Sequence, residues 1–319
     1  MSKTTKIWLI TASFLILIGC VIFAGVMTVL KWDFTKLSTV KYQTNDYEID
    51  EEYKNISIVT DTADIVFVPS KNFKTSVVCY ERKNLEHSVS VKDGSLVIEI
   101  VDTSKWYEYI GINFGTPKIT VSIPQGEYGA LSISSSTGDI EIPKDFKFES
   151  IDIIESTGDV TNYASASEKI KIKTSTGDIS IADIEVKNLD LTVSTGKITA
   201  ENINCGENIA VKVKTGKIRF ENVTCNSLSS SGTTGDITLK NVIANGLFSV
   251  KRDTGDIKLY DCDAGEIFVK TSTGNVKGNL MSSKVFVVHS DTGRINVPKT
   301  IEGGKCEITT DTGDIDIKV

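Results

Sequence analysis

The segment Thr176-Gly177-Asp178-Ile179-Ser180-Ile181 carries the signal that decides the fold: a Thr-Gly pair followed by alternating apolar residues. The pair recurs ten times, and successive glycines lie 19 or 20 residues apart. A period this short and regular is typical of one structural unit that is copied and stacked, with a core shared between neighbouring copies. The glycines of these pairs are Gly138, Gly158, Gly177, Gly196, Gly216, Gly235, Gly255, Gly274, Gly293 and Gly313.

Each copy predicts short β-strands. Ile179 and Ile181 alternate with polar residues directly after the glycine, and a second alternating run, such as Leu189 to Val193, follows roughly ten residues later. No stretch of 118–319 has the 3.6-residue apolar spacing of an amphipathic helix. We therefore expect an all-β fold, a right-handed parallel β-solenoid (β-helix or β-roll) of 19–20-residue coils with two or three strands each.

The glycine column and the residue after it have a structural explanation. A tight corner often needs a positive φ, which glycine adopts without a Cβ clash. The next residue is Asp in most copies, as in Asp178, and we expect its carboxylate to accept hydrogen bonds from turn amides. Calcium-binding nonapeptide coils have a denser Gly-Gly-x-Gly-x-Asp pattern that this chain lacks. The sequence predicts no metal site and no cofactor.

The N-terminus predicts a membrane span. Residues 7–30 contain no charge across 24 positions, which as a helix gives roughly 36 Å, enough for the apolar core of a bilayer. Lys3 and Lys6 precede this stretch, so the bias of flanking basic residues predicts a single-pass protein with its N-terminus inside and everything after Lys31 outside.

Two alternatives to a permanent span remain open. Leu17-Ile18-Gly19-Cys20 fits the pattern that precedes a lipidated cysteine, although the residues after Cys20 stay apolar. Cleavage as a signal peptide is the other, although the apolar stretch is longer than the roughly 7–15 residues usual for one. All three interpretations export the solenoid.

Three regions follow from these patterns. Residues 1–36 form the cytoplasmic tail and the transmembrane signal-anchor, 37–117 irregular N-terminal coils and a cap, and 118–319 the regular solenoid. Asp61-Thr62-Ala63-Asp64 reads as a degenerate coil with alanine in place of glycine. At the other end, we expect the copy that contains Asp314, Asp316 and Lys318 to leave a strand edge open.

An aromatic segment interrupts the irregular region. We interpret it as a cap over the first coils, because terminal units of a solenoid must protect their core. The alternative is a partner-binding loop, since aromatic side chains are favoured in contact surfaces. Its aromatic residues are Trp106, Tyr107, Tyr109 and Phe114.

Cysteine and histidine give no clear chemical site. Cys205 and Cys225 occupy equivalent positions in consecutive coils, so they could form a disulfide or be stacked small residues like Ala244 and Ala264. Cys262 aligns with core positions. The chain has only two histidines, His87 and His289, and no set of neighbouring residues for metal binding or catalysis is evident at either.

Composition excludes some functions. The net charge of −7 and the pI near 5.1 argue against nucleic-acid binding. A polysaccharide-acting β-helix enzyme is a minor alternative, because such enzymes build clefts from long inserted loops and 118–319 has almost none.

The repeated Ser-Thr-Gly-Asp-Ile units behind an apolar N-terminus resemble an exported bacterial family of unknown function labelled "putative adhesin", over roughly residues 40–319. The resemblance implies a non-catalytic, adhesin-like surface interaction module in the bacterial cell membrane, with an unidentified protein or polysaccharide ligand, and it brings no catalytic residues. The alternative is a component of a cell-envelope stress or regulatory system that binds a membrane protein through the span or the aromatic segment.

Overall fold

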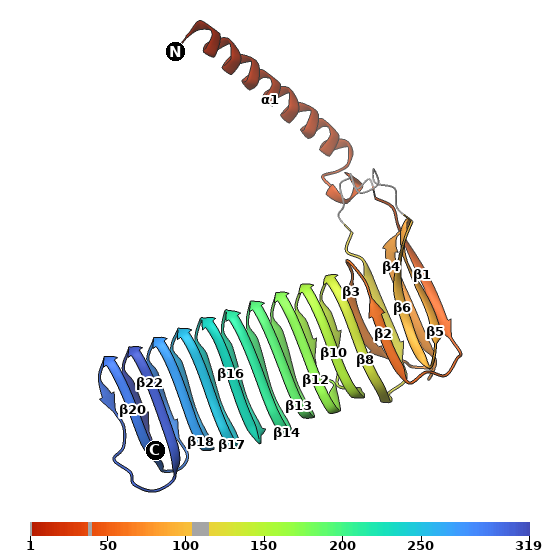
Figure 1. Ribbon diagram of the computed structural model, residues 1–319. Helices are drawn as coiled ribbons and strands as arrows, with labels where there is room; N and C mark the ends of the chain where they lie inside the picture. The colour runs from red at the N-terminus through yellow and green to blue at the C-terminus, as the bar shows by residue number, and fades with distance from the viewer. Residues whose placement is uncertain (1, 38–39, 104–114) are drawn as a thin grey trace.

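The computed structural model describes residues 2–37, 40–103 and 115–319, which form a long α-helix that extends away from one end of a long stack of β-strands (Figure 1). Helix α1 (Lys3–Val29) begins after Ser2, whose hydroxyl accepts a hydrogen bond from the Thr5 amide at 3.1 Å. Its most apolar window has a mean hydropathy of 2.6, and none of that window is buried against the protein. The helix is thus long and apolar enough to cross a membrane. A short 3-10 helix, η1 (Phe34–Leu37), follows.

The first strands belong to the irregular region and to the first coil of the solenoid. They are β1 (Tyr42–Ile49), β2 (Asn55–Val59), β3 (Asp64–Pro69), β4 (Thr75–Arg82), β5 (Leu85–Lys92), β6 (Ser95–Asp102) and β7 (Lys118–Ile123).

The strands of the regular region pair in parallel with those of the next coil. They are β8 (Gly126–Thr137), β9 (Ile140–Ile142), β10 (Phe146–Thr157), β11 (Val160–Asn162), β12 (Ser165–Thr176), β13 (Ile179–Thr195), β14 (Ile198–Thr215), β15 (Ile218–Cys225), β16 (Ser227–Thr234), β17 (Ile237–Thr254), β18 (Ile257–Thr273), β19 (Val276–Leu280), β20 (Lys284–Thr292), β21 (Ile295–Asn296), β22 (Gly304–Thr312) and β23 (Ile315–Lys318). The prediction of a parallel β-solenoid is confirmed, with about ten turns.

One coil, β13, shows how the sequence builds the turn of the solenoid. Its alternating apolar residues point inward and are buried. The backbone bends at Asp183, where φ is 56°, and shifts register between Val186 and Asn188 before it reaches the Gly196 corner. Two bends and one glycine corner divide the coil into three straight segments, which settles the strand number that the sequence pattern left between two and three.

The glycine column forms the tightest corner. In nine of the ten Thr-Gly pairs φ lies between 121° and 154°, and Gly293 in the outermost coil is the exception. Each corner also stacks directly on the next: a Cβ built on Gly216, for example, would overlap the carbonyl oxygen of Gly196. Both the backbone conformation and the close approach require glycine, as predicted.

The residue after the glycine forms a ladder along the solenoid, and the prediction that its carboxylate accepts turn amides is confirmed. Asp159 Oδ1 accepts the Asp178 amide at 2.7 Å, and Asp178 Oδ1 accepts the Lys197 amide at 2.7 Å. Each carboxylate therefore binds the amide of the equivalent residue in the neighbouring coil. The ladder begins at Asp64, which accepts the Asp139 amide at 3.0 Å.

A second polar ladder runs along the bend that β13 makes at Asp183. Asn202 donates to Asp183 at 2.8 Å and Asn222 donates to Asn202 at 2.9 Å, with φ near 55° at each. Asn and Asp are the residues that adopt this left-handed conformation most readily after glycine. The sequence contains a signal for this bend, because an Asp or Asn lies six residues after the glycine in five successive copies. These residues are Asp183, Asn202, Asn222, Asn241 and Asp261.

The N-terminal region contains a degenerate coil and a cap. Ala63 lies against the Gly138 corner, and Thr62 bridges to Thr137, so Asp61-Thr62-Ala63-Asp64 is a coil as predicted. Strands β6 and β7 add a further turn parallel to β2 and β3. Strands β4 and β5 then pair antiparallel with β7 and β6, and β1 pairs antiparallel with β4. These antiparallel strands cover the first edge of the solenoid (Figure 1).

The other end of the solenoid differs from the expectation. Strand β22 lies between β18 and β20, and β23 lies between β19 and β21, so the copy that ends the sequence is inserted one position before the end of the stack. The expectation that Asp314, Asp316 and Lys318 border an open edge is therefore wrong, because β23 is paired on both sides. The outermost coil is β20 and β21, where Val287 is 51% exposed.

The column three positions before each corner glycine holds mostly polar residues, with Val193, Val213 and Gly232 as its apolar members. It contains Thr174, Thr271 and Thr310, whose hydroxyls donate to glycine carbonyl oxygens of the neighbouring coil. Glu155 occupies the same column at 1% exposure, where its Oε1 accepts the amides of Ser156 and Thr157. Its Oε2 has no partner among the described residues. Burial raises the pKa of this carboxyl above its ordinary value of 4.5, and the bonds to the two amides only partly oppose the shift.

Replacing Glu155 by glutamine should raise the melting temperature at pH 7. Because the folded-state pKa is raised, the stability contribution of Glu155 is fully present below 4.5 and is lost as the pH rises through the raised value. Glutamine keeps the Oε1 acceptor and never ionises, so the gain over the wild type should vanish below pH 4.5. Thermal unfolding across this range tests it, with Glu141→Gln on the exposed face as control. A gain that persists at low pH would contradict the explanation.

Candidate functional site

A groove of about 950 Å³ crosses the outer surface of the first regular coils. Its lining comes from β8, β10, β12, β13 and β14, together with Lys54 from the irregular region. The groove follows one corner of the coils, where the strand register shifts after Phe148, Ala166 and Val186. The register shifts thus place the groove along the axis of the stack, across several coils.

The size of the side chains in one column explains the hollow. Tyr128 pairs with Phe148 of the next coil, and their rings lie 5.8 Å apart between centroids. The following positions in the column are Ala166, Val186 and Cys205. Because these side chains fill much less volume than the two rings, the surface falls away beyond the aromatic pair. The aromatic pair therefore forms one end of the groove.

The groove is rich in charge but close to neutral. Its lining includes three lysines and four glutamates. Lys187 Nζ lies 3.1 Å from Glu168 Oε2, and Lys54 Nζ lies 3.3 Å from Glu149 Oε2. The hydrogen bond to Glu168 raises the pKa of Lys187. A balanced lining of this kind suits a polar ligand with little net charge, and it disfavours a polyanion.

The sequence reasoning missed this groove. The ten glycines of the Thr-Gly pairs, which the sequence singled out, lie at a different corner of the coils and have the structural role described above. Of the residues named as a partner-binding alternative, Trp106, Tyr107, Tyr109 and Phe114 lie outside the described residues. The available signal was the fall in side-chain size from Phe148 to Ala166 in aligned repeats.

The cysteines of the coils are packed thiols. Cys205 and Cys225 are both buried and free in the structure. Cys225 pairs with Ala244, which pairs with Ala264, so the expected column of small residues is present. Cys262 is a core residue at 1% exposure, as predicted. Burial raises the pKa of Cys225 and of Cys306 to about 12, which keeps both thiols protonated at neutral pH.

The histidines differ from one another. His289 is exposed, and its Nε2 lies 2.7 Å from Asp291 Oδ1. His87 is 3% exposed, and its Nδ1 lies 2.6 Å from Glu81 Oε2. The sequence made no set of neighbours evident at His87, but β4 and β5 bring Glu81, six positions earlier, into contact with it inside the cap.

Comparisons with known proteins found solved structures of low sequence identity. The crystal structure of a "putative adhesin" from Bacteroides fragilis is 18% identical; the match covers 87% of this chain and 96% of that one, with a TM-score of 0.39. A "putative lipid binding protein" from Parabacteroides distasonis is 14% identical over 88% and 98% of the two chains, with a TM-score of 0.41. No curated protein matches the chain.

The family assignment rests on a match that covers the solenoid. The model of the family described as Toastrack DUF4097 matches residues 53–208 and again residues 204–319. These two stretches include the degenerate first coil, the cap strands β4 and β5, and all of the regular coils. The resemblance drawn from the repeated Thr-Gly units is thus confirmed, and the chain belongs to the Toastrack DUF4097 family.

Proposed function

We propose that the chain is a non-catalytic surface interaction module that binds an extended polar polymer in the groove along its first coils. The observation that carries the proposal is the groove itself: it runs across several stacked coils, has an aromatic pair at one end, and balances lysines against glutamates. An extended ligand of low net charge, such as a segment of polysaccharide or protein, complements a surface of this length and charge.

The apolar helix supports an extracytoplasmic location for the module. Helix α1 is long and apolar enough to hold the chain in the bacterial cell membrane, and Lys3 and Lys6 favour the inner side for its N-terminus. In this orientation the solenoid lies on the extracytoplasmic side, where cell-envelope polymers are present. The ion pairs of Glu149 and Glu168 with lysines support a binding role for these carboxylates rather than proton transfer.

Site-specific photocrosslinking on intact bacterial cells tests the proposal. A photoreactive amino acid replaces Ser167, which is exposed and lines the groove, or Ser229, which is exposed on a distant coil. We expect an adduct from position 167 and none from position 229. Lys187→Glu should reduce the adduct severalfold, because it breaks the pair with Glu168 and makes the groove acidic. Digestion by glycosidase or by protease then identifies the polymer.

Two outcomes would contradict this function. Equal crosslinking at positions 167 and 229 would mean that the groove is not selective. The second outcome is capture of one defined membrane protein that is lost when α1 is exchanged for an unrelated apolar helix, without any adduct at position 167. That result would favour the regulatory alternative, in which the span recognises a membrane partner.

A further inference from the structure

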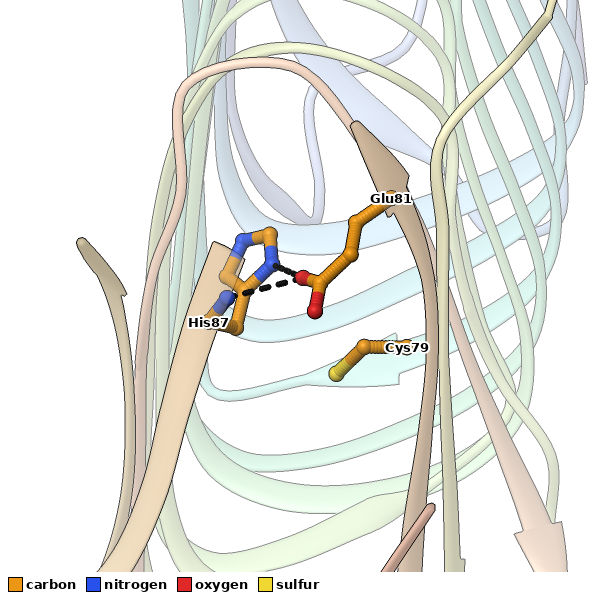
Figure 2. A group of neighbouring side chains, drawn as sticks. All are labelled: Cys79, Glu81 and His87. Atoms are coloured by element: carbon orange, nitrogen blue, oxygen red, sulfur yellow. Dashed lines mark hydrogen bonds and ion pairs between the residues drawn. The ribbon is translucent and has the colours of Figure 1, made fainter. Parts of the chain in front are cut away.

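Cys79, Glu81 and His87 meet inside the cap, and none of them lines the groove (Figure 2). Residues 79 and 81 point to the same side of β4, and β5 brings His87 back against them. One ligand atom from each residue, a sulfur, a carboxylate oxygen and a ring nitrogen, all lie within 4.8 Å of one another. Their exposures are 0%, 1% and 3%. The fold thus places three side chains that can ligate a metal in one buried site.

The imidazole and the carboxylate are held in fixed orientations. Glu81 Oε2 accepts the His87 backbone amide at 2.8 Å and lies 2.6 Å from Nδ1, while Oε1 accepts the Asn45 amide group at 2.6 Å. On the far side of the ring, His87 Nε2 lies 2.8 Å from the Thr60 hydroxyl. Metal-binding histidines fix their tautomer by a hydrogen bond of this kind from the ring nitrogen that does not bind the ion, here Nε2. The other nitrogen, here Nδ1, is then the one directed at the ion.

The thiol of Cys79, like that of Cys306, differs from the buried thiols of Cys205, Cys225 and Cys262. Cys205 and Cys262 donate their S–H to backbone carbonyl oxygens. Within the described part of the chain no hydrogen bond is found for Cys79, and its sulfur faces the carboxylate and imidazole pair (Figure 2). A buried sulfur that is not engaged by the backbone remains open to an ion.

The charge balance favours a divalent cation. A buried carboxylate is costly unless its charge is compensated. Among the described residues His87 is the only ion-pair partner found for Glu81. A cysteine thiolate, a glutamate carboxylate and a neutral imidazole together carry two negative charges, which one divalent cation neutralises. The mixed sulfur, nitrogen and oxygen set is typical of zinc, whereas magnesium and calcium prefer oxygen ligands alone.

We propose that Cys79, Glu81 and His87 bind one zinc-class divalent cation that joins β4 to β5 in the cap. The ion takes the place of the proton between His87 Nδ1 and Glu81 Oε2, and on binding this proton and the thiol proton of Cys79 are released to solvent. Tetrahedral zinc needs these two atoms about 3.4 Å apart, so the side chains move apart by less than about 1 Å from the present 2.6 Å. Three protein ligands leave a fourth position for a solvent molecule.

Cobalt(II) is the probe that tests the site, because it occupies zinc sites and reports thiolate ligands by absorption. The full chain is purified in detergent under reducing conditions, stripped with a chelator, and carries Cys20→Ser to remove the exposed thiol of α1. We expect one equivalent of Co²⁺ to give a thiolate-to-cobalt charge-transfer band that Zn²⁺ abolishes. A rise in melting temperature with Zn²⁺ is the second readout.

Variants identify the ligands. Cys79→Ser should abolish the charge-transfer band, and His87→Gln should weaken Co²⁺ binding at least ~100-fold. Cys306→Ser is the matched control, because that thiol is equally buried but lies in a regular coil outside the cluster. Binding by all three variants alike, or no band in the parent chain, would overturn the proposal.

A measurement without variants keeps the proposal testable if a substitution prevents folding. X-ray absorption spectroscopy of the zinc-loaded parent chain should show one sulfur and otherwise nitrogen or oxygen ligands. Zinc with no sulfur ligand, or with several, would overturn the site. Neither result depends on the groove, so the metal proposal and the proposed function can fail independently.

Discussion

Gly216→Ala should destabilise the solenoid by about 4 kcal/mol or more, which places it among the exceptional single substitutions. Two effects add. The backbone at Gly216 has φ of 142°, a conformation that is essentially restricted to glycine and costs other residues about 1–3 kcal/mol. The new Cβ would also overlap the carbonyl oxygen of Gly196, so the backbone of two coils must shift. Urea unfolding of the full chain in detergent, followed by circular dichroism, measures the loss.

Gly206→Ala is the control for this prediction. Gly206 lies ten residues earlier, has no positive φ, and a Cβ there would approach nothing closer than the Cα of Lys187 at 3.9 Å. Its replacement should change the free energy of unfolding by no more than about 0.5 kcal/mol. Similar losses for the two variants would mean that the corner conformation is not what requires glycine.

The regular part of the fold follows from the sequence because every copy repeats the same local requirement. The Thr-Gly pair sets the corner, the next carboxylate binds the neighbouring amide, and the alternation of Ile179 and Ile181 sets the buried face. Stacking repeats these choices, so one correct coil predicts the following ones. Even Ala63 could be assigned to the glycine column, because the residues around it keep the pattern.

The end of the stack could not be predicted in the same way. Chain order places the copy at 304–318 last, but β22 and β23 are inserted between earlier and later strands. Neighbouring copies carry nearly the same pattern, so the periodicity fits either order of the last two coils equally well. The order depends on long-range pairing, which a local pattern does not contain.

The groove and the cap cluster escaped prediction for a different reason. Both arise where copies differ from one another, at Ala166 beside Phe148 and at the antiparallel strands β4 and β5. Cys79, Glu81 and His87 share no repeat, and only the turn between their strands brings them together. Departures from a repeat show where an individual site can lie, but the contacts that form it require the fold.

The second large effect concerns Gly232 and Arg252, which depend on each other in the buried polar column. Arg252 is 2% exposed, and its Nη1 donates to the Val213 carbonyl oxygen at 2.7 Å, two coils away. It reaches that oxygen by passing Gly232, which stacks between Val213 and Arg252. Burial lowers the pKa of this guanidinium, and Nε and Nη2 have no partner among the described residues. The arginine is therefore a costly insertion that the missing side chain of Gly232 makes room for.

Gly232→Ala alone should destabilise the chain by about 3 kcal/mol, because its Cβ would overlap both Arg252 Nη1 and the Val213 carbonyl oxygen. Arg252→Thr alone should be close to neutral: it removes two unsatisfied donors and restores the residue found at Thr271, but leaves a cavity beside Gly232. The double variant has an alanine at position 232 and a threonine at position 252, so both coils have a short side chain at this position of the column. Coils with a β-carbon at this position, such as that of Val213, show that the backbone can accommodate one.

The double variant should therefore be more stable than Gly232→Ala, and the coupling energy between the two sites should be at least about 1 kcal/mol. Urea unfolding midpoints of the four proteins, with the full chain in detergent, give this coupling directly. Strict additivity would show that the overlap of the new Cβ with the Val213 carbonyl, rather than with the guanidinium, dominates the loss. In that event the backbone around Gly232, and not the path of Arg252, would explain why this one coil carries glycine in a column that elsewhere holds a side chain.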